Sequence, residues 1–118
     1  MRHLVKNKRI SRNSPQTRAM LRTMAASLVL HEKIETTLPK AKLLKAYFER
    51  LMDRARKAKT PLNAHRTLNI ELFDPRASYK MVEELLVRFK DRKSGYVRIT
   101  HLGFRPGDAA IKAQIAFV

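Results

Sequence analysis

Apolar residues recur at helical spacing in four stretches of the chain. The clearest stretch lies between residues 38 and 55, where one apolar face is formed by Ala41, Leu44, Phe48, Leu51, Met52 and Ala55. Steps of one, three and four residues place these side chains on one side of a helix with 3.6 residues per turn. Other stretches predict a helix that ends near Leu30, a shorter one that ends near Leu72, and a fourth that includes Phe89.

Each predicted helix begins with a polar residue followed closely by proline. A side-chain oxygen at such a position can accept hydrogen bonds from free backbone N–H groups, and proline lacks the N–H that would go unpaired there. We therefore expect helix starts at four places: Ser14-Pro15, Thr37 with Pro39, Thr60-Pro61 and Asp74-Pro75.

The period changes to two near the end of the chain. Residues Tyr96–Leu102 and Ile111–Phe117 alternate between apolar and polar side chains, and Pro106-Gly107 between them suits a type II turn. These segments predict a β-hairpin, with Lys33–Thr37 as a third strand. The expected fold is α+β, a small three-stranded mixed sheet packed against about four helices. Residues 14–118 would form one globular domain, preceded by an extended basic arm at residues 1–13.

Positive charge dominates the composition. Twenty-six Lys and Arg against ten Asp and Glu give a formal net charge of +16. Repulsion on this scale disfavours a compact chain unless a polyanion neutralises it, which favours nucleic acid as the partner. An anionic membrane is the main rival, but no predicted helix pairs a basic face with an exposed aromatic face, and no apolar run approaches about 20 residues. The absence of cysteine excludes disulfides and thiolate metal sites.

The first residues are basic and contain no acid. A transit peptide or a disordered tail would have a similar composition, but a cationic arm gains affinity by displacing counterions from phosphates, and we favour an RNA-binding arm. Its basic side chains are Arg2, His3, Lys6, Lys8, Arg9 and Arg12. Arg18 and Arg22, one turn apart on the first helix, would continue this surface.

The hairpin combines arginines with flat rings. Arg98 and Arg105 can bind phosphate, while rings such as Tyr96 and His101 can stack on unpaired bases, which RNA offers and duplex DNA largely withholds. Tyr96 and the nearby Phe104 could equally belong to the core or the turn. On the second helix, Lys40 is a further candidate for phosphate contact, together with Arg50 and Arg54.

Catalytic constellations are missing from the sequence. The four histidines have no ligand partners at metal-binding spacing, and the pair Glu83-Glu84 does not converge on a helix. Three glycines cannot build a phosphate-binding loop. We therefore expect a protein without enzymatic activity, cofactor, metal or small-molecule substrate.

Several segments together resemble the family of large-subunit ribosomal proteins numbered seventeen in bacteria. They follow one another along almost the whole chain: residues 1–3, 18–22, 26–28, 31–38, 40–42, 95–99, 102–103 and 105–110. The resemblance implies a structural part of the large ribosomal subunit in the bacterial cytoplasm, bound to ribosomal RNA and to neighbouring ribosomal proteins near the polypeptide exit tunnel. A free-standing DNA- or RNA-binding protein of the nucleoid type is the alternative.

Overall fold

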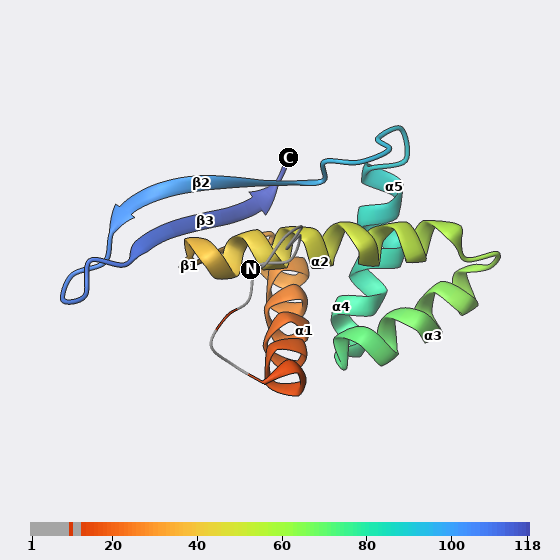
Figure 1. Cartoon of the computed structure of the whole chain (residues 1–118). Coiled ribbons are helices and arrows are strands. Elements are labelled where there is room, and N and C mark those ends of the chain that lie inside the picture. Colours follow the sequence, from red (N-terminus) through yellow and green to blue (C-terminus); the bar gives the residue numbers. More distant parts are fainter. Residues whose placement is uncertain (1–9, 11–12) are drawn as a thin grey trace, which may run out of the picture.

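The computed structural model describes residue 10 and residues 13–118 (Figure 1). Its helices are α1 (Ser14–His31), α2 (Leu38–Lys57), α3 (Pro61–Leu72), α4 (Pro75–Lys80) and α5 (Leu86–Arg88), with a π-helical turn at Met81–Leu85 between the last two. The strands are β1 (Lys33–Thr37), β2 (Val97–Phe104) and β3 (Ile111–Phe117). The α+β class predicted from the sequence is confirmed.

The sheet is antiparallel throughout and its strand order is β1-β3-β2. The prediction of a mixed sheet is wrong in this respect. β2 and β3 are joined by a short turn, which makes them antiparallel, and β1 joins the free edge of β3 in the opposite direction to it. Alternation along a strand indicates which residues share a face, but not which edge the strand joins or in which direction.

All helices lie on one side of the sheet, and α2 runs along it (Figure 1). Ile34, Ile115 and Ile99 lie side by side across the three strands and face this helix layer. The rings of Phe48 on α2 and Phe117 on β3 are 5.3 Å apart between centroids. All six residues of the apolar face predicted for α2 are buried.

Two of the four predicted caps are confirmed. The side chain of Thr60 accepts a hydrogen bond from the backbone N–H of Asn63 at 3.2 Å, and that of Asp74 accepts one from Arg76 at 3.0 Å. The cap expected at Ser14 is wrong, because Asn13 is the residue before α1. Thr37 does precede α2 as expected, but neither its side chain nor that of Asn13 makes a cap hydrogen bond. Thr37 is the last residue of β1, and α2 begins at Leu38. Pro39 therefore occupies the second position of the helix rather than the first.

The fourth predicted helix runs without a break from α4 to α5, but its middle turn is π-helical rather than α-helical. Met81, Val82 and Leu85 in this turn are all buried. An extra residue in one turn rotates the following residues about the helix axis. As a consequence Leu86, which the regular pattern assigns to the apolar face, is only half-buried, while Phe89 just beyond the helix is buried.

The loop before β2 is held by a carboxylate and a guanidinium from α2. Glu49 accepts hydrogen bonds from the backbone N–H groups of Gly95 at 3.1 Å and Tyr96 at 2.9 Å. Arg56 donates to the hydroxyl of Tyr96 at 2.6 Å and to the carbonyls of Lys90 and Arg92. These bonds fix the start of the hairpin on the helix layer.

Replacing Glu49 with alanine should destabilise the fold by about 2 kcal/mol, because two backbone N–H groups then lose their acceptor in a partly buried site. Urea unfolding followed by circular dichroism measures this loss. Asp53→Ala is the matched control, since Asp53 is exposed on the same helix, and should change stability by less than about 0.5 kcal/mol. Equal effects of the two substitutions would refute the role assigned to Glu49.

A second carboxylate joins the end of α1 to the last helical segment. Glu32 lies 3.0 Å from Nη2 of Arg88 and 3.2 Å from Nζ of Lys80. The hydrogen bonds from Arg88 and then Lys80 lower the pKa of Glu32 below its ordinary value of 4.5. A carboxyl with a lowered folded-state pKa stabilises the fold above its unfolded pKa, and the effect is lost as the pH falls through the folded value.

Glu32→Gln should therefore be less stable than the native chain at pH 7, and the difference should shrink as the pH falls below 4.5 and then disappear. Urea unfolding of both chains between pH 7 and pH 3 measures it. A difference that stays constant over this range would show that the charge of Glu32 does not contribute.

Candidate nucleic-acid interface

The outer face of the sheet carries basic side chains and is not covered by any helix of the described chain (Figure 1). The register pairs Lys33 with Ala116 and Ala116 with Arg98, so the two cations lie on the same face across the central strand. Lys112 on β3 is on this face as well, opposite Thr37. Glu35 on β1 is an acid on the same face. We call Lys33, Arg98 and Lys112 the outer-face cations.

The far end of the hairpin extends beyond the start of α2 (Figure 1). Phe104 is paired with Ile111 there, and it is 70% exposed because no helix lies beneath it. The register shifts between His101 and Gly103, and Gly103 has a φ of 102° that favours glycine. His101, a candidate from the sequence, is exposed on β2.

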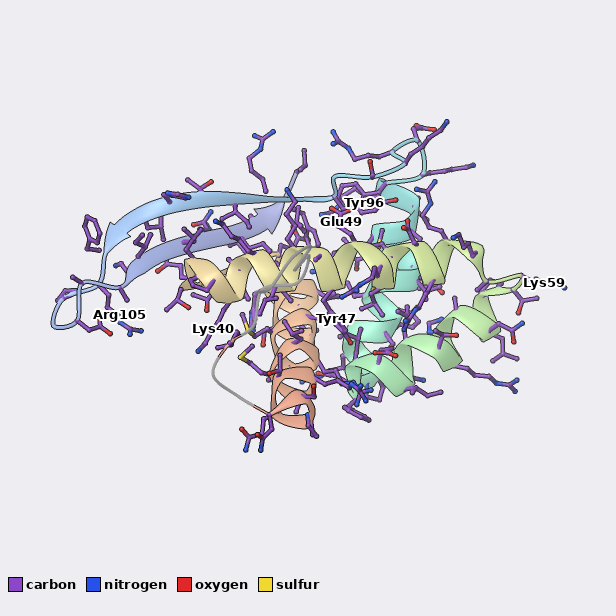
Figure 2. The ribbon with its side chains drawn as sticks, viewed as in Figure 1. Lys40, Tyr47, Glu49, Lys59, Tyr96 and Arg105 are labelled. Carbon is purple, nitrogen blue, oxygen red and sulfur yellow. The ribbon has the colours of Figure 1, made fainter. Side chains whose placement is uncertain are left out.

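Arg105 lies at the hairpin tip, where an acid neutralises part of its charge (Figure 2). Its Nε is 3.1 Å from Oδ1 of Asp108, and its Nη2 contacts Oδ2. Asp108 also accepts a hydrogen bond from the backbone N–H of Ala110. The hydrogen bonds from Arg105 and Ala110 lower the pKa of Asp108 to about 2, so the carboxylate is charged at neutral pH.

Tyr96 does not belong to the interface. Its side chain is fully buried, its ring lies 5.5 Å from that of Phe89, and its hydroxyl donates to the carbonyl of Lys93 at 2.9 Å. The prediction that Tyr96 stacks on a base is wrong, because β2 begins above the helix layer and its first residues are part of the core.

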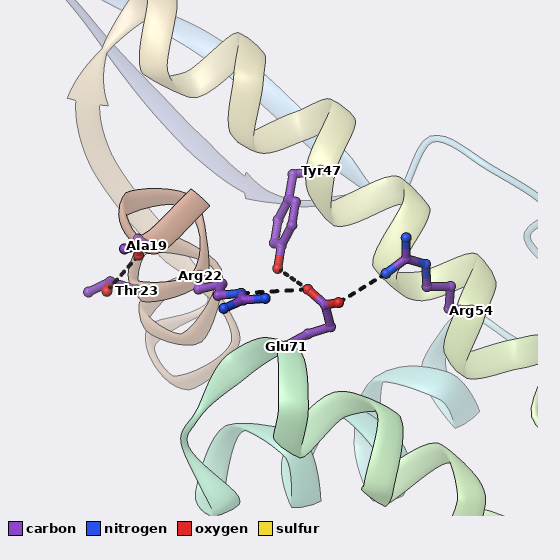
Figure 3. Close-up of polar contacts among 6 residues, drawn as sticks. All are labelled: Ala19, Arg22, Thr23, Tyr47, Arg54 and Glu71. Atoms are coloured by element: carbon purple, nitrogen blue, oxygen red, sulfur yellow. Dashed lines mark hydrogen bonds and ion pairs between the residues drawn. The ribbon is translucent and has the colours of Figure 1, made fainter. Parts of the chain in front are cut away.

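Arg22 is engaged inside the protein, in a cluster around Glu71 (Figure 3). Its Nε is 3.8 Å from Oε2 of Glu71, and its guanidinium carbon is 4.8 Å from the ring centroid of Phe73. Arg54 donates to Oε1 of Glu71 at 3.1 Å, and the hydroxyl of Tyr47 donates to Oε2 at 2.8 Å. Burial and this hydrogen bond raise the pKa of Tyr47 to about 12. The cluster joins α1, α2 and α3, so Arg22 does not continue a free basic surface.

The other candidates from the sequence have different surroundings. Arg18 is exposed on α1, and Lys40 is half-buried in the first turn of α2, where Figure 2 labels it. Arg98 is exposed on β2. The basic residues of the arm, Arg2, His3, Lys6, Lys8, Arg9 and Arg12, lie outside the described residues.

Sequence reasoning missed Lys33 as a candidate. It lies in the first strand, sixty-five positions before Arg98 in the chain, and only the pairing of β1 with β3 places the two cations on one face. In a strand at Lys33–Thr37, Lys33 and Glu35 share one face, but the sequence does not indicate which residues of other strands lie beside them.

The described part of the chain holds no group of three or more His, Asp or Glu side chains arranged to bind a metal ion. Among the described helices, none is both long and apolar enough to cross a membrane. The exposed side chains described on the hairpin are cationic at Arg98 and Arg105 and aromatic at Phe104.

Comparison with known proteins agrees with this chemistry. The family model described as Ribosomal protein L17 matches residues 20–118. The proteins named large ribosomal subunit protein bL17 from Rickettsia typhi and Campylobacter jejuni are 45% and 46% identical to this chain over 118 residues, which is all of it. The match covers 85% of the Rickettsia protein and 99% of the Campylobacter protein. The chain therefore belongs to the ribosomal protein L17 family, whose members are structural components of the large ribosomal subunit and not enzymes.

Proposed function

We propose that this chain is a structural constituent of the large ribosomal subunit that binds ribosomal RNA through its basic arm and its C-terminal hairpin. The observation that carries the proposal is a large excess of exposed positive charge on a chain that is 45% identical over its whole length to a bL17 protein. Like its relatives, it acts in the cytoplasm, where bacterial ribosomes are found. Its partners are ribosomal RNA and the ribosomal proteins beside it.

The distribution of ion pairs supports RNA as the ligand. In the described residues, Lys33, Arg98 and Lys112 have no carboxylate within 4.0 Å, and neither does Arg18. Cations without internal partners release counterions when they meet phosphates, which is the main source of affinity for a nucleic acid. The exposed ring of Phe104, on the inner face at the free end of the hairpin, offers a stacking surface for an unpaired base.

The mechanism is charge neutralisation combined with shape recognition, without chemical turnover. The sheet holds the outer-face cations at fixed positions, so little conformational freedom is lost when they bind phosphates. The exit-tunnel location is the implication of the family resemblance, and crosslinking to a nascent chain is its direct test.

The full chain should sediment with the large subunit through a moderate salt wash, and removal of residues 1–12 should weaken its binding to ribosomal RNA while leaving the helical circular dichroism largely intact. The plot of log K against log salt should become shallower by up to about four units, because the deleted segment holds five Lys and Arg. Filter binding between low and moderate salt measures the slope. Salt-insensitive binding of the full chain, or equal competition by duplex DNA, would refute the proposal.

Asp108→Asn should strengthen RNA binding by roughly two- to fivefold, a modest gain because the Arg105–Asp108 ion pair is exposed to solvent. The substitution removes the carboxylate that competes with phosphate for Arg105, but its amide oxygen can still accept the bond from Ala110 that shapes the turn. Asp91→Asn changes the net charge equally at an exposed position in the loop before β2 and serves as the control. Weaker binding of Asp108→Asn would show that the ion pair itself positions Arg105 for RNA.

A further inference from the structure

The solvent face of α2 is a second basic surface of the described chain, separate from the outer face of the hairpin. At 3.6 residues per turn, five of its exposed positions fall within about 80° of the helix circumference. These positions are Lys42, Ala46, Arg50, Asp53 and Lys57, all of them exposed. We call Lys42, Arg50 and Lys57 the α2 cations.

The α2 cations lack the internal partners that their neighbours on the same helix have. Arg54 pairs with Glu71, and Arg56 donates to carbonyls of the loop before β2. In the described chain no carboxylate lies within 4.0 Å of an α2 cation. Asp53 is one turn from Lys57, but the two do not form an ion pair. The structural tasks of α2 are thus performed by other residues.

Helix stability does not account for two of these charges. A solvated helix face gains from acids placed four residues before bases, but Leu38 precedes Lys42 and Ala46 precedes Arg50 at this spacing, and only Lys57 has an acid there, Asp53. No acid occupies the first turn of α2, and a cation near that end, such as Lys42, opposes the helix dipole. Lys57 in the last turn does favour the dipole, so the charges that helix stability leaves unexplained are those of Lys42 and Arg50.

The spacing of the α2 cations suits an extended polyanion. They follow one another at about 12 Å and then about 10 Å along the helix, from a rise of 1.5 Å per residue. Ala46, between the first two, is small and lets a phosphate backbone approach the helix closely.

We propose that the solvent face of α2 binds the phosphate backbone of an RNA segment other than the one bound by the hairpin. Because α2 packs on the inner face of the sheet, its solvent face and the outer-face cations lie on opposite sides of the sheet. Figure 2 shows Arg105 at one end of the molecule and Lys59, just past α2, at the other. The screening length at physiological salt is about 8 Å, so the two surfaces act independently. The inference rests on the proposed function, since it assumes that the chain binds ribosomal RNA.

The test uses the full chain, a transcript of large-subunit ribosomal RNA and three variants. The first replaces the α2 cations (Lys42→Gln, Arg50→Gln, Lys57→Gln), and the second replaces two outer-face cations (Arg98→Gln, Lys112→Gln). The third is the charge-matched control (Lys59→Gln, Arg66→Gln, Lys90→Gln), exposed positions outside both surfaces. Circular dichroism and thermal unfolding verify the fold of each variant, and filter binding and hydroxyl-radical footprinting of the RNA are the readouts.

The α2 variant should lose about tenfold or more in affinity, with a salt slope shallower by about two to three units, since each phosphate contact contributes about one. It should lose protection of one RNA segment, and the outer-face variant should lose protection of a different one. The control should keep both footprints. An α2 variant that behaves like the control, or that loses the same segment as the outer-face variant, would overturn the inference and leave the proposed function intact. If the native chain itself gives no salt-dependent protection, the proposed function fails as well.

Discussion

The scarcity of negative charge is the constraint on which this structure depends. Only ten acids oppose twenty-six lysines and arginines, and the fold uses several of them where elements meet. Glu32 joins the end of α1 to the last helical segment, Glu49 anchors the start of the hairpin, and Glu71 gathers side chains from α1 and α2. Each of these acids neutralises or orients groups that would otherwise repel or remain unpaired. The uncompensated charge is left on the surface, where only an external polyanion can offset it.

The register of the central strand connects this charge pattern to the core. Ile115 on β3 lies between Ile34 and Ile99 on the inner face, and its neighbour Ala116 lies between Lys33 and Arg98 on the outer face. A shift by one residue would expose the isoleucines and bury the cations, so the hydrophobic core itself fixes where the cations lie. The small side chain of Ala116 leaves the space between the two cations open.

The features visible in the sequence are those that depend on local periodicity. The apolar face of α2, the hairpin with its glycine turn, and the caps at Thr60 and Asp74 all follow from residues close together in the chain. Features that depend on distant partners were not predictable in this way. The antiparallel placement of β1, the π-helical turn and the capture of Arg22 by Glu71 each depend on how separate elements pack. The strongest sequence signal for a site, basic residues near aromatic ones, could not separate a buried ring from an exposed one.

Tyr96 and Phe104 illustrate the reason for this, because they lie near opposite ends of the same strand. Tyr96 is at the anchored end, where Glu49 and Arg56 hold the backbone and the hydroxyl against the helices. Phe104 is at the free end, where the sheet extends past α2 and the ring is 70% exposed. A phenylalanine side chain left in water loses the stabilisation of about 1.5–3 kcal/mol that burial would give. A hairpin with only a structural role would have no reason to carry an exposed phenylalanine. A ribbon anchored at one end and free at the other presents its ring and cations in a fixed arrangement, and under the proposed function this would lower the entropy lost on binding a structured RNA.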